Sequence, residues 1–382
     1  MIRILDKEKC CGCAACYNVC PKECISLVKD EEGFVYPIVN EIKCVNCGLC
    51  EKVCSFQINE PKRKKKTDTY AVKALNIELR KNSSSGGVFG LVSEQIINDS
   101  GVVYGVSFSS DYKSCSHIRI DNISDLEKLR GSKYFQSDIG NIYELVKKDL
   151  QNNKLVLFSG VPCQINGLKM FLQKEYDNLV TMEVVCHGVP SPLLWEKYYN
   201  YLESKNNKKI TKVSFRNKVD GWHNFSLSYD VNNVFHHKIQ SEDPFMRMFL
   251  RDYCLRPSCY SCNAKILESM ADLTVADFWG IEKVAPEMDD DLGVSLVLVQ
   301  TDKGRKLFDI IQVESKAVTF DEGIEFNPAY YKSCEKPILR NIFFDDLNTK
   351  KFEFMIKKYA SNIKGPIYKR ALRFAKKCFK RF

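Results

Sequence analysis

Two stretches decide the fold of the first part of the chain: CCGCAACYNVCP (10–21) and CVNCGLCEKVCS (44–55). The first has cysteines at positions 10, 13, 16 and 20, and the second repeats them 34 residues later, at 44, 47, 50 and 54. A constant shift at four positions indicates an internally duplicated unit. Residues 1–60 hold too few apolar side chains for a hydrophobic core, so metal–thiolate bonds must supply the missing stability.

The spacing C-x2-C-x2-C-x3-C is that of ligands to 4Fe–4S clusters in two-cluster ferredoxins, where the fourth cysteine of each run binds the other cluster. We therefore expect two sets of ligands: Cys10, Cys13, Cys16 and Cys54, and Cys44, Cys47, Cys50 and Cys20. A pair of zinc sites is the alternative, but zinc usually joins two C-x2-C units across a longer gap. Cys11 and Cys24 are extra, and we expect them to be small buried apolar residues.

Composition and charge restrict the class of protein. The 382 residues suggest more than one domain, and no apolar run approaches membrane-spanning length. Eighteen cysteines without an apolar leader favour metal–thiolate chemistry in a reducing cytoplasm. The net charge of +9 is concentrated in KRKKK (62–66) and in the tail 361–382, and the remaining 44 basic and 48 acidic residues argue against nucleic-acid binding.

From Tyr70 onward, helical and strand-like segments alternate, which predicts an α/β or α+β domain with a mixed sheet. Strands are expected at 102–108, 154–160 and 179–186, with helices at 162–174 and 192–204. The predicted organisation is a ferredoxin-type domain at 1–60, a basic linker at 61–69, a larger domain at 70–350 and a basic tail at 351–382.

A second set of cysteines lies in the larger domain: Cys163, Cys186, Cys259 and Cys262. Cys163 and Cys186 follow predicted strands, and the ends of strands in α/β sheets converge on one edge where sites form. The four thiols could hold one more cluster, with Cys254 as an alternative ligand. Cys163 taken alone could instead be a buried thiol or a nucleophile at a helix N-terminus.

Two further segments have the composition of a phosphate or ring site. RKNSSSGGVFG (80–90) leads into a predicted helix, and its backbone N–H groups could face a phosphate or simply cap the helix. GSKYFQS (131–137) adds a lysine, hydroxyls and an aromatic ring. Because one-electron clusters need a converter to act on two-electron substrates, we expect a flavin. His187, next to Cys186, could transfer protons or be structural.

Together these motifs resemble the coenzyme F420 hydrogenase/dehydrogenase β-subunit family. The resemblance rests on SSSGG, GSKYFQS, SGVPCQINGLK, CHGVPSP, LRPSCYSC and DLTVADFWG, together with the double cysteine run. It implies FAD and a third 4Fe–4S cluster held by Cys163, Cys186, Cys259 and Cys262. It also implies a flavin site lined by Ser84, Ser85, Gly86, Gly87, Ser132, Lys133, Tyr134, Gln136 and Ser137. Members with a fused ferredoxin are similar to bacterial proteins found with surface-polysaccharide genes.

The resulting expectation is a cytoplasmic iron–sulfur flavoprotein. It would exchange a hydride with a small organic substrate or a deazaflavin coenzyme, with His187 as the candidate catalytic residue and a redox protein as a partner. The alternative is an electron-carrier subunit without turnover of its own. The tail interleaves basic and apolar residues, so it could lie on an anionic membrane surface or an acidic partner, or be a solvated helix end packed on its own domain. A homo-oligomer is also compatible with the sequence.

Overall fold

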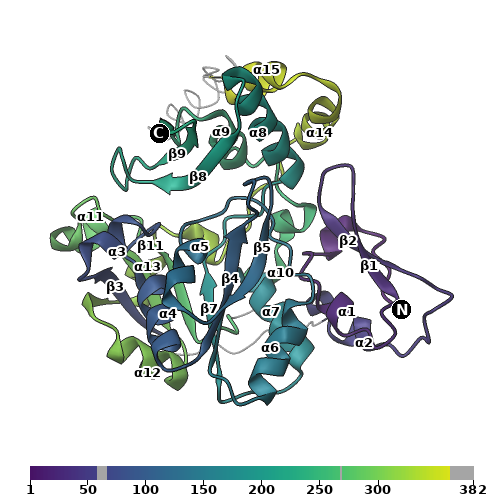
Figure 1. The fold of residues 1–382 in the computed structure, drawn as a ribbon, viewed down its shortest axis with the longest axis horizontal. Helices are drawn as coiled ribbons and strands as arrows, with labels where there is room; N and C mark the ends of the chain where they lie inside the picture. The colour runs from purple at the N-terminus through teal and green to yellow at the C-terminus, as the bar shows by residue number, and fades with distance from the viewer. Residues whose placement is uncertain (58–66, 267–268, 362–382) are drawn as a thin grey trace, which may run out of the picture.

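The computed structural model describes residues 1–57, 67–266 and 269–361 (Figure 1). A small cysteine-rich module, purple in Figure 1, lies against a larger body built around a mixed sheet. This arrangement confirms the predicted fold class, a small ferredoxin-type region followed by a larger mixed-sheet α/β domain. The basic run at 62–66 and the tail from residue 362 onward lie outside the described residues.

The duplication of the sequence is repeated in the backbone of the N-terminal module. Helix α1 (Ala15–Asn18) and helix α2 (Leu49–Lys52) are separated by the same 34 residues as the cysteines. Each follows a left-handed residue, Ala14 (φ 60°) or Gly48 (φ 75°). Between the two runs, β1 (Ile25–Lys29) and β2 (Val35–Val39) form the expected antiparallel hairpin. The 3-10 helices η1 (Lys7–Lys9) and η2 (Ser55–Gln57) complete the module.

The larger domain is organised by an eight-stranded sheet with the order β13-β3-β12-β11-β7-β6-β4-β5. The pairs β4–β6, β6–β7 and β7–β11 are parallel, and the outer pairs are antiparallel. All five residues of the central strand β6 are buried, as expected for a strand covered on both faces. The strands span β3 (Asp68–Ala74), β4 (Val102–Phe108), β5 (Cys115–Ile120), β6 (Val156–Gly160), β7 (Leu179–Val184), β11 (Leu273–Asp277), β12 (Ser295–Val299) and β13 (Val313–Val318).

Helices cover both faces of this sheet. On one face α6 (Ile142–Gln151) and α7 (Pro162–Leu172) pack on alternate residues of β4 and β6, and α1 of the small module joins the same core. On the other face the cover comes from α4 (Val88–Asn98), α5 (Leu126–Leu129) and α12 (Asp302–Ile310). Shorter helices lie around the edges: α3 (Ile77–Lys81), η3 (Ile123–Asp125), α11 (Ile281–Val284), η5 (Pro286–Met288), α13 (Phe320–Ile324) and η6 (Pro328–Tyr330).

A second layer, at the top of Figure 1, is built from a three-stranded antiparallel sheet and helices around an aromatic core. Its elements are α8 (Pro192–Asn206), β8 (Ile210–Asn217), β9 (Ser226–Val231), β10 (Val234–Ile239), α9 (Pro244–Leu250), α14 (Arg340–Thr349), α15 (Phe352–Met355) and the π-helical turn η7 (Ile356–Ala360). Phe352, Met355 and Tyr359 are buried in this core. The globular part of the chain therefore continues to residue 360, beyond the expected start of the tail at 351.

The small module is docked firmly onto both layers. Phe34 of its hairpin is buried in the aromatic core. Glu32 accepts two hydrogen bonds from the Arg340 guanidinium, whose side chain is 4% exposed. Asn18 donates to the backbone carbonyl of Gly140 at 2.8 Å. Buried contacts of this kind fix the position of the module relative to the larger domain.

Within residues 1–57, 67–266 and 269–361, no helix combines the length and apolar character needed to cross a membrane.

Candidate functional site

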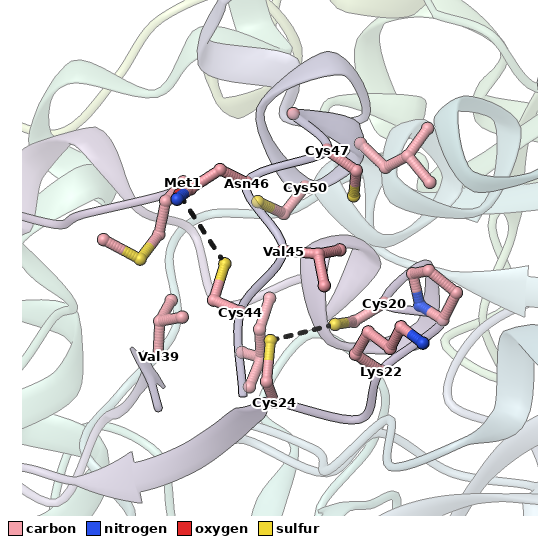
Figure 2. Close-up of a pocket in the computed structure, with 14 residues that line it drawn as sticks. Met1, Cys20, Lys22, Cys24, Val39, Cys44, Val45, Asn46, Cys47 and Cys50 are labelled. Carbon is pink, nitrogen blue, oxygen red and sulfur yellow. Dashed lines mark hydrogen bonds between the residues drawn. The ribbon is translucent and has the colours of Figure 1, made fainter. Parts of the chain in front are cut away.

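One pocket in the small module joins cysteines from both runs (Figure 2). Cys44, Cys47 and Cys50 of the second run line it together with Cys20 of the first. This is the set expected for one cluster if the fourth cysteine of each run crosses over. Cys24 also lines the pocket, and its sulfur lies 3.3 Å from that of Cys20. The extra cysteine is buried as expected, but it lies beside a candidate ligand.

The remaining cysteines of the two runs, Cys10, Cys13, Cys16 and Cys54, lie around Cys16 of α1. Burial raises the pKa of the Cys16 thiol, and the neighbouring sulfurs of Cys10, Cys54 and Cys50 raise it further. Cys54 of the second run therefore lies beside Cys16 and Cys10 of the first. Cys13 is close to Cys16 and packs against Gly167 of α7, on the larger domain.

A second pocket brings together the four cysteines singled out in the larger domain. Cys163, Cys186, Cys259 and Cys262 all line it. Cys163 is the second residue of α7, directly after β6, and Cys186 follows β7, so both occupy the carboxyl ends of adjacent parallel strands. Cys259 lies in the 3-10 helix η4 (Pro257–Ser261), and Cys262 follows it. The short helix α10 (Asn263–Ile266) comes next.

The alternative ligand Cys254 lies elsewhere. Its side chain is fully buried in the aromatic core, and its backbone carbonyl accepts a hydrogen bond from Ser191. The pocket is lined by the C-x2-C pair instead. Burial raises the pKa of the Cys186 thiol, and burial also raises that of Cys259, to about 11. Without a metal these thiols are protonated at neutral pH, so binding of a metal cluster must release protons.

Cys11, the extra cysteine expected to be a small buried apolar residue, also lines this pocket. A hydrogen bond with the Cys11 thiol raises the pKa of Cys163, and burial adds to the effect. Cys11 also makes a thiol hydrogen bond with Cys13. The extra cysteine of the first run thus lies between a candidate ligand of the small module and one of the larger domain. Its position next to Cys10 was the available signal, because neighbouring side chains on an extended segment point in opposite directions.

The two segments expected to bind a phosphate or a ring, 80–90 and 131–137, contact each other through Ser84 and Ser132. The Ser84 hydroxyl accepts a hydrogen bond from the Ser132 backbone N–H at 2.9 Å and lies 3.0 Å from the Ser132 hydroxyl. Gly87 is the left-handed residue (φ 92°) that starts α4, and within the described chain no side chain caps that helix. Gly86 packs so closely on the backbone of β3 and β12 that a Cβ atom would collide with the Val72 carbonyl.

The other residues expected near the flavin have partners elsewhere. The Lys133 amino group donates to three backbone carbonyls at the end of α5, and burial lowers its pKa to about 7. Gln136 donates to the Cys11 carbonyl and accepts from Arg256, so it faces the small module. Ser137 contacts Gln164 at 2.8 Å. These three side chains support the fold. They add nothing to the loop of Ser83, Ser84 and Ser85, which we call the serine loop.

Aromatic rings connect the serine loop with the cysteine-lined pocket of the larger domain, which we call the larger pocket. The Tyr134 ring lies 5.2 Å from Phe249, and Phe249 lies 5.4 Å from the imidazole of His187 (centroid distances). His187 lines the pocket of Cys186, and its Nε2 atom lies 2.6 Å from a carboxylate oxygen of Asp252. The candidate catalytic histidine thus lines the larger pocket, and the rings of Phe249 and Tyr134 lie between it and the serine loop.

Comparison with known proteins identifies two segments of the chain. Residues 9–58 match the family model described as a 4Fe-4S dicluster domain. Residues 153–323 match the model of the C-terminal region of the coenzyme F420 hydrogenase/dehydrogenase β-subunit. The chain therefore combines a segment that matches a 4Fe–4S dicluster domain with a segment that matches the C-terminal region of the F420 hydrogenase/dehydrogenase β-subunit, and these matches indicate iron–sulfur electron transfer of the oxidoreductase type.

Two individual relatives add detail. An uncharacterized ferredoxin of Methanocaldococcus jannaschii is 54% identical over 33 residues, which are 9% of this chain and 43% of that ferredoxin. The match spans less than half the length of that curated relative. A chain in a xenon-derivatized structure of the F420-reducing NiFe hydrogenase complex from Methanosarcina barkeri aligns over 80% of this chain and 97% of its own length. Its identity is 15% and its TM-score 0.45, a likeness too weak to bear on function.

Proposed function

We propose that electrons pass between the two clusters of the small module, a third 4Fe–4S cluster in the larger domain, and FAD. A small organic substrate would then gain or lose a hydride. One observation carries the proposal: Cys163, Cys186, Cys259 and Cys262, which come from three separate segments, line a single pocket that also contains Cys11 of the small module.

The chemistry of this pocket suits an iron–sulfur cluster. Four thiolates in one buried pocket are the ligand set that 4Fe–4S clusters use. The Cys11 thiol makes hydrogen bonds with Cys163 of this set and with Cys13, a ligand proposed for the first cluster of the small module. One proposed ligand of each cluster would therefore lie next to Cys11, and such proximity favours electron exchange between the two clusters.

The surroundings of the serine loop suit a phosphate-bearing cofactor. The first N–H groups of α4 have no side-chain cap in the described chain, and such groups attract anions. Among the described residues, the buried Nε atoms of Arg130 and Arg216 have no hydrogen-bond partner. Arg130 approaches the first turn of α4 at Gly90, and Arg216 donates to the Ser84 carbonyl at 3.3 Å. We propose that Ser84, Ser132, Arg130 and Arg216 hold FAD, which would supply the conversion between one-electron and two-electron chemistry.

The chain's own residues would orient the substrate near Tyr134 and His187, between the serine loop and the larger pocket. The substrate we propose is a small organic molecule or a deazaflavin-like coenzyme, and the family resemblance links the reaction to surface-polysaccharide synthesis. We propose the cytoplasm as the location and a redox protein as the partner of the small module. The competing function is an electron-carrier subunit that holds clusters but no flavin.

Anaerobic purification followed by iron, sulfide and flavin determination tests the proposal. The expected result is about twelve iron atoms per chain, at four per cluster, and about one FAD. The variant Arg130→Gln should lose FAD, whereas Lys128→Gln, which changes an exposed lysine in the helix just before Arg130, should retain it. Iron at the expected level with no retained or saturable FAD would favour the carrier subunit. About eight iron atoms per chain would show that only two clusters are bound and would rule out the third cluster.

A further inference from the structure

Three side chains of metal-ligating types, His187, Asp252 and Cys334, come together beside the larger pocket, which His187 lines. The His187 Nε2 atom lies 2.6 Å from Asp252 Oδ1 and 3.4 Å from the Cys334 sulfur. One ligand atom of each residue lies within 4.8 Å of the others. The three residues are far apart in sequence, so the fold brings them together. Cys334 lies beyond the segment that matches the β-subunit family.

Each residue is held in place by its own contacts. Asp252 adopts a left-handed backbone conformation (φ 62°) just after α9, and its carbonyl accepts a hydrogen bond from Tyr260 at 2.5 Å. The Lys265 amino group joins the His187 carbonyl to that of Lys332, two residues before Cys334.

We propose that His187, Asp252 and Cys334 bind a single zinc ion. In a tetrahedral zinc site, with Zn–N about 2.0 Å and Zn–S about 2.3 Å, the nitrogen and sulfur ligands are about 3.5 Å apart. The distance from His187 Nε2 to the Cys334 sulfur is 3.4 Å. The imidazole and the carboxylate are at hydrogen-bond distance and would separate by less than about 1 Å to admit the metal. Both side chains are partly exposed, and the contacts described above hold their backbone carbonyls, so this adjustment needs only the side chains to move.

The ligand set indicates both the identity of the metal and the type of site. Nitrogen, oxygen and thiolate ligands together suit zinc, and two anionic ligands neutralise its charge. Three protein ligands leave the fourth position open, which is the pattern of catalytic zinc sites and not of structural ones. The open position could take water or a substrate oxygen. His187 would then act as a metal ligand and not as the proton carrier that its position next to Cys186 first suggested.

Metal analysis of the intact holoprotein tests this site. Protein prepared anaerobically with added Zn²⁺ and dialysed free of loose metal should contain about one zinc per chain. Zinc should be lost in Cys334→Ser and in Asp252→Asn, with iron unchanged in both. The matched control is Asp289→Asn: Asp289 pairs with His223 at 2.9 Å, a histidine–aspartate pair outside the three-residue group. This variant should keep its zinc.

X-ray absorption at the zinc edge identifies the ligands independently of any variant. The expected spectrum has one sulfur at about 2.3 Å and nitrogen or oxygen ligands at about 2.0 Å. Zinc with four sulfur ligands would mean that zinc had entered a cluster site and would overturn the proposal. Absence of bound zinc, equal zinc in all variants, or loss of iron in Cys334→Ser would also overturn it. The last result would make Cys334 a cluster ligand.

Discussion

The Nε atom of Arg256 donates a hydrogen bond to the backbone carbonyl of Cys10 at 2.7 Å. The same guanidinium, 1% exposed, also donates to the Val35 carbonyl at 3.0 Å and to the Gln136 side chain at 2.8 Å. Arg256 lies three residues before Cys259, so one buried side chain ties the loop of the larger pocket to the first cysteine run. It is a positive charge placed between two groups of candidate cluster ligands.

The first prediction concerns this charge. Replacing Arg256 by glutamine should lower the reduction potential of the neighbouring cluster by tens of millivolts, because a nearby positive charge favours the reduced, more negative form. Arg256→Lys keeps the charge but loses the forked hydrogen bonds. Its potential should remain closer to that of the wild type. Potentiometric titration followed by EPR measures both. An unchanged potential in Arg256→Gln would show that the residue acts only in docking.

A second prediction follows from the 3.3 Å distance between the sulfurs of Cys20 and Cys24. Cys20→Ser should retain much of its iron, because Cys24 can move into the vacant ligand position. The double variant Cys20→Ser with Cys24→Ser should lose one cluster, about four iron atoms per chain. Cys24→Ser alone is the control and should keep all its iron. Iron loss in Cys20→Ser equal to that in the double variant would rule out this exchange of ligands.

The sequence predicted the structure best where the spacing of residues is itself required by the cofactor that they bind, as in the two cysteine runs. The duplicated run placed Cys20 with the second set because the crossing of the fourth cysteine follows from the motif itself. The buried strands and the helices between them were also recognisable from their periodicity. Cys163 and Cys186 could be grouped because the carboxyl ends of neighbouring parallel strands share one edge.

Residues outside such patterns could not be grouped from the sequence. Asp252 and Cys334 approach His187 only through tertiary packing of distant loops. Lys133 is a residue type that often binds phosphate, yet its amino group donates hydrogen bonds to backbone carbonyls at the C-terminal end of α5. Composition alone does not decide between a side chain that binds a ligand and one that satisfies the backbone.

The third prediction is a dependence of stability on pH. His117 in β5 is buried, stacks on Phe158 and has a ring nitrogen 3.1 Å from the Ser159 carbonyl. Burial lowers its pKa from 6.5 to about 4. The unfolded state therefore binds more protons between these values, and stability from neutral His117 is present above about pH 6.5 and is lost as the pH falls toward 4.

This loss amounts to about 2 kcal/mol between about pH 7.5 and about pH 5. Chemical denaturation of wild type and His117→Gln at both pH values isolates the contribution, because other titrating groups are common to the two proteins. The variant should be less stable at the higher pH, since it loses ring stacking, but its stability should fall less on acidification. Parallel pH profiles would contradict the assignment of a neutral buried imidazole.

The last prediction concerns the pocket that joins the two parts of the chain. Serine at positions 259 and 262 replaces two of the thiols proposed to hold the third cluster with hydroxyls, which hold iron–sulfur clusters poorly. The double variant Cys259→Ser with Cys262→Ser should lose about a third of the iron and keep the EPR signals of the small module. Cys254→Ser is the matched control, because Cys254 precedes Cys259 by five residues but is buried in the aromatic core. It should retain all its iron.

In the double variant, electrons supplied to the small module should no longer reduce FAD, as measured by flavin absorbance in stopped flow. Full iron retention with an unchanged spectrum would mean that these cysteines are structural and that no cluster connects the module with the larger domain.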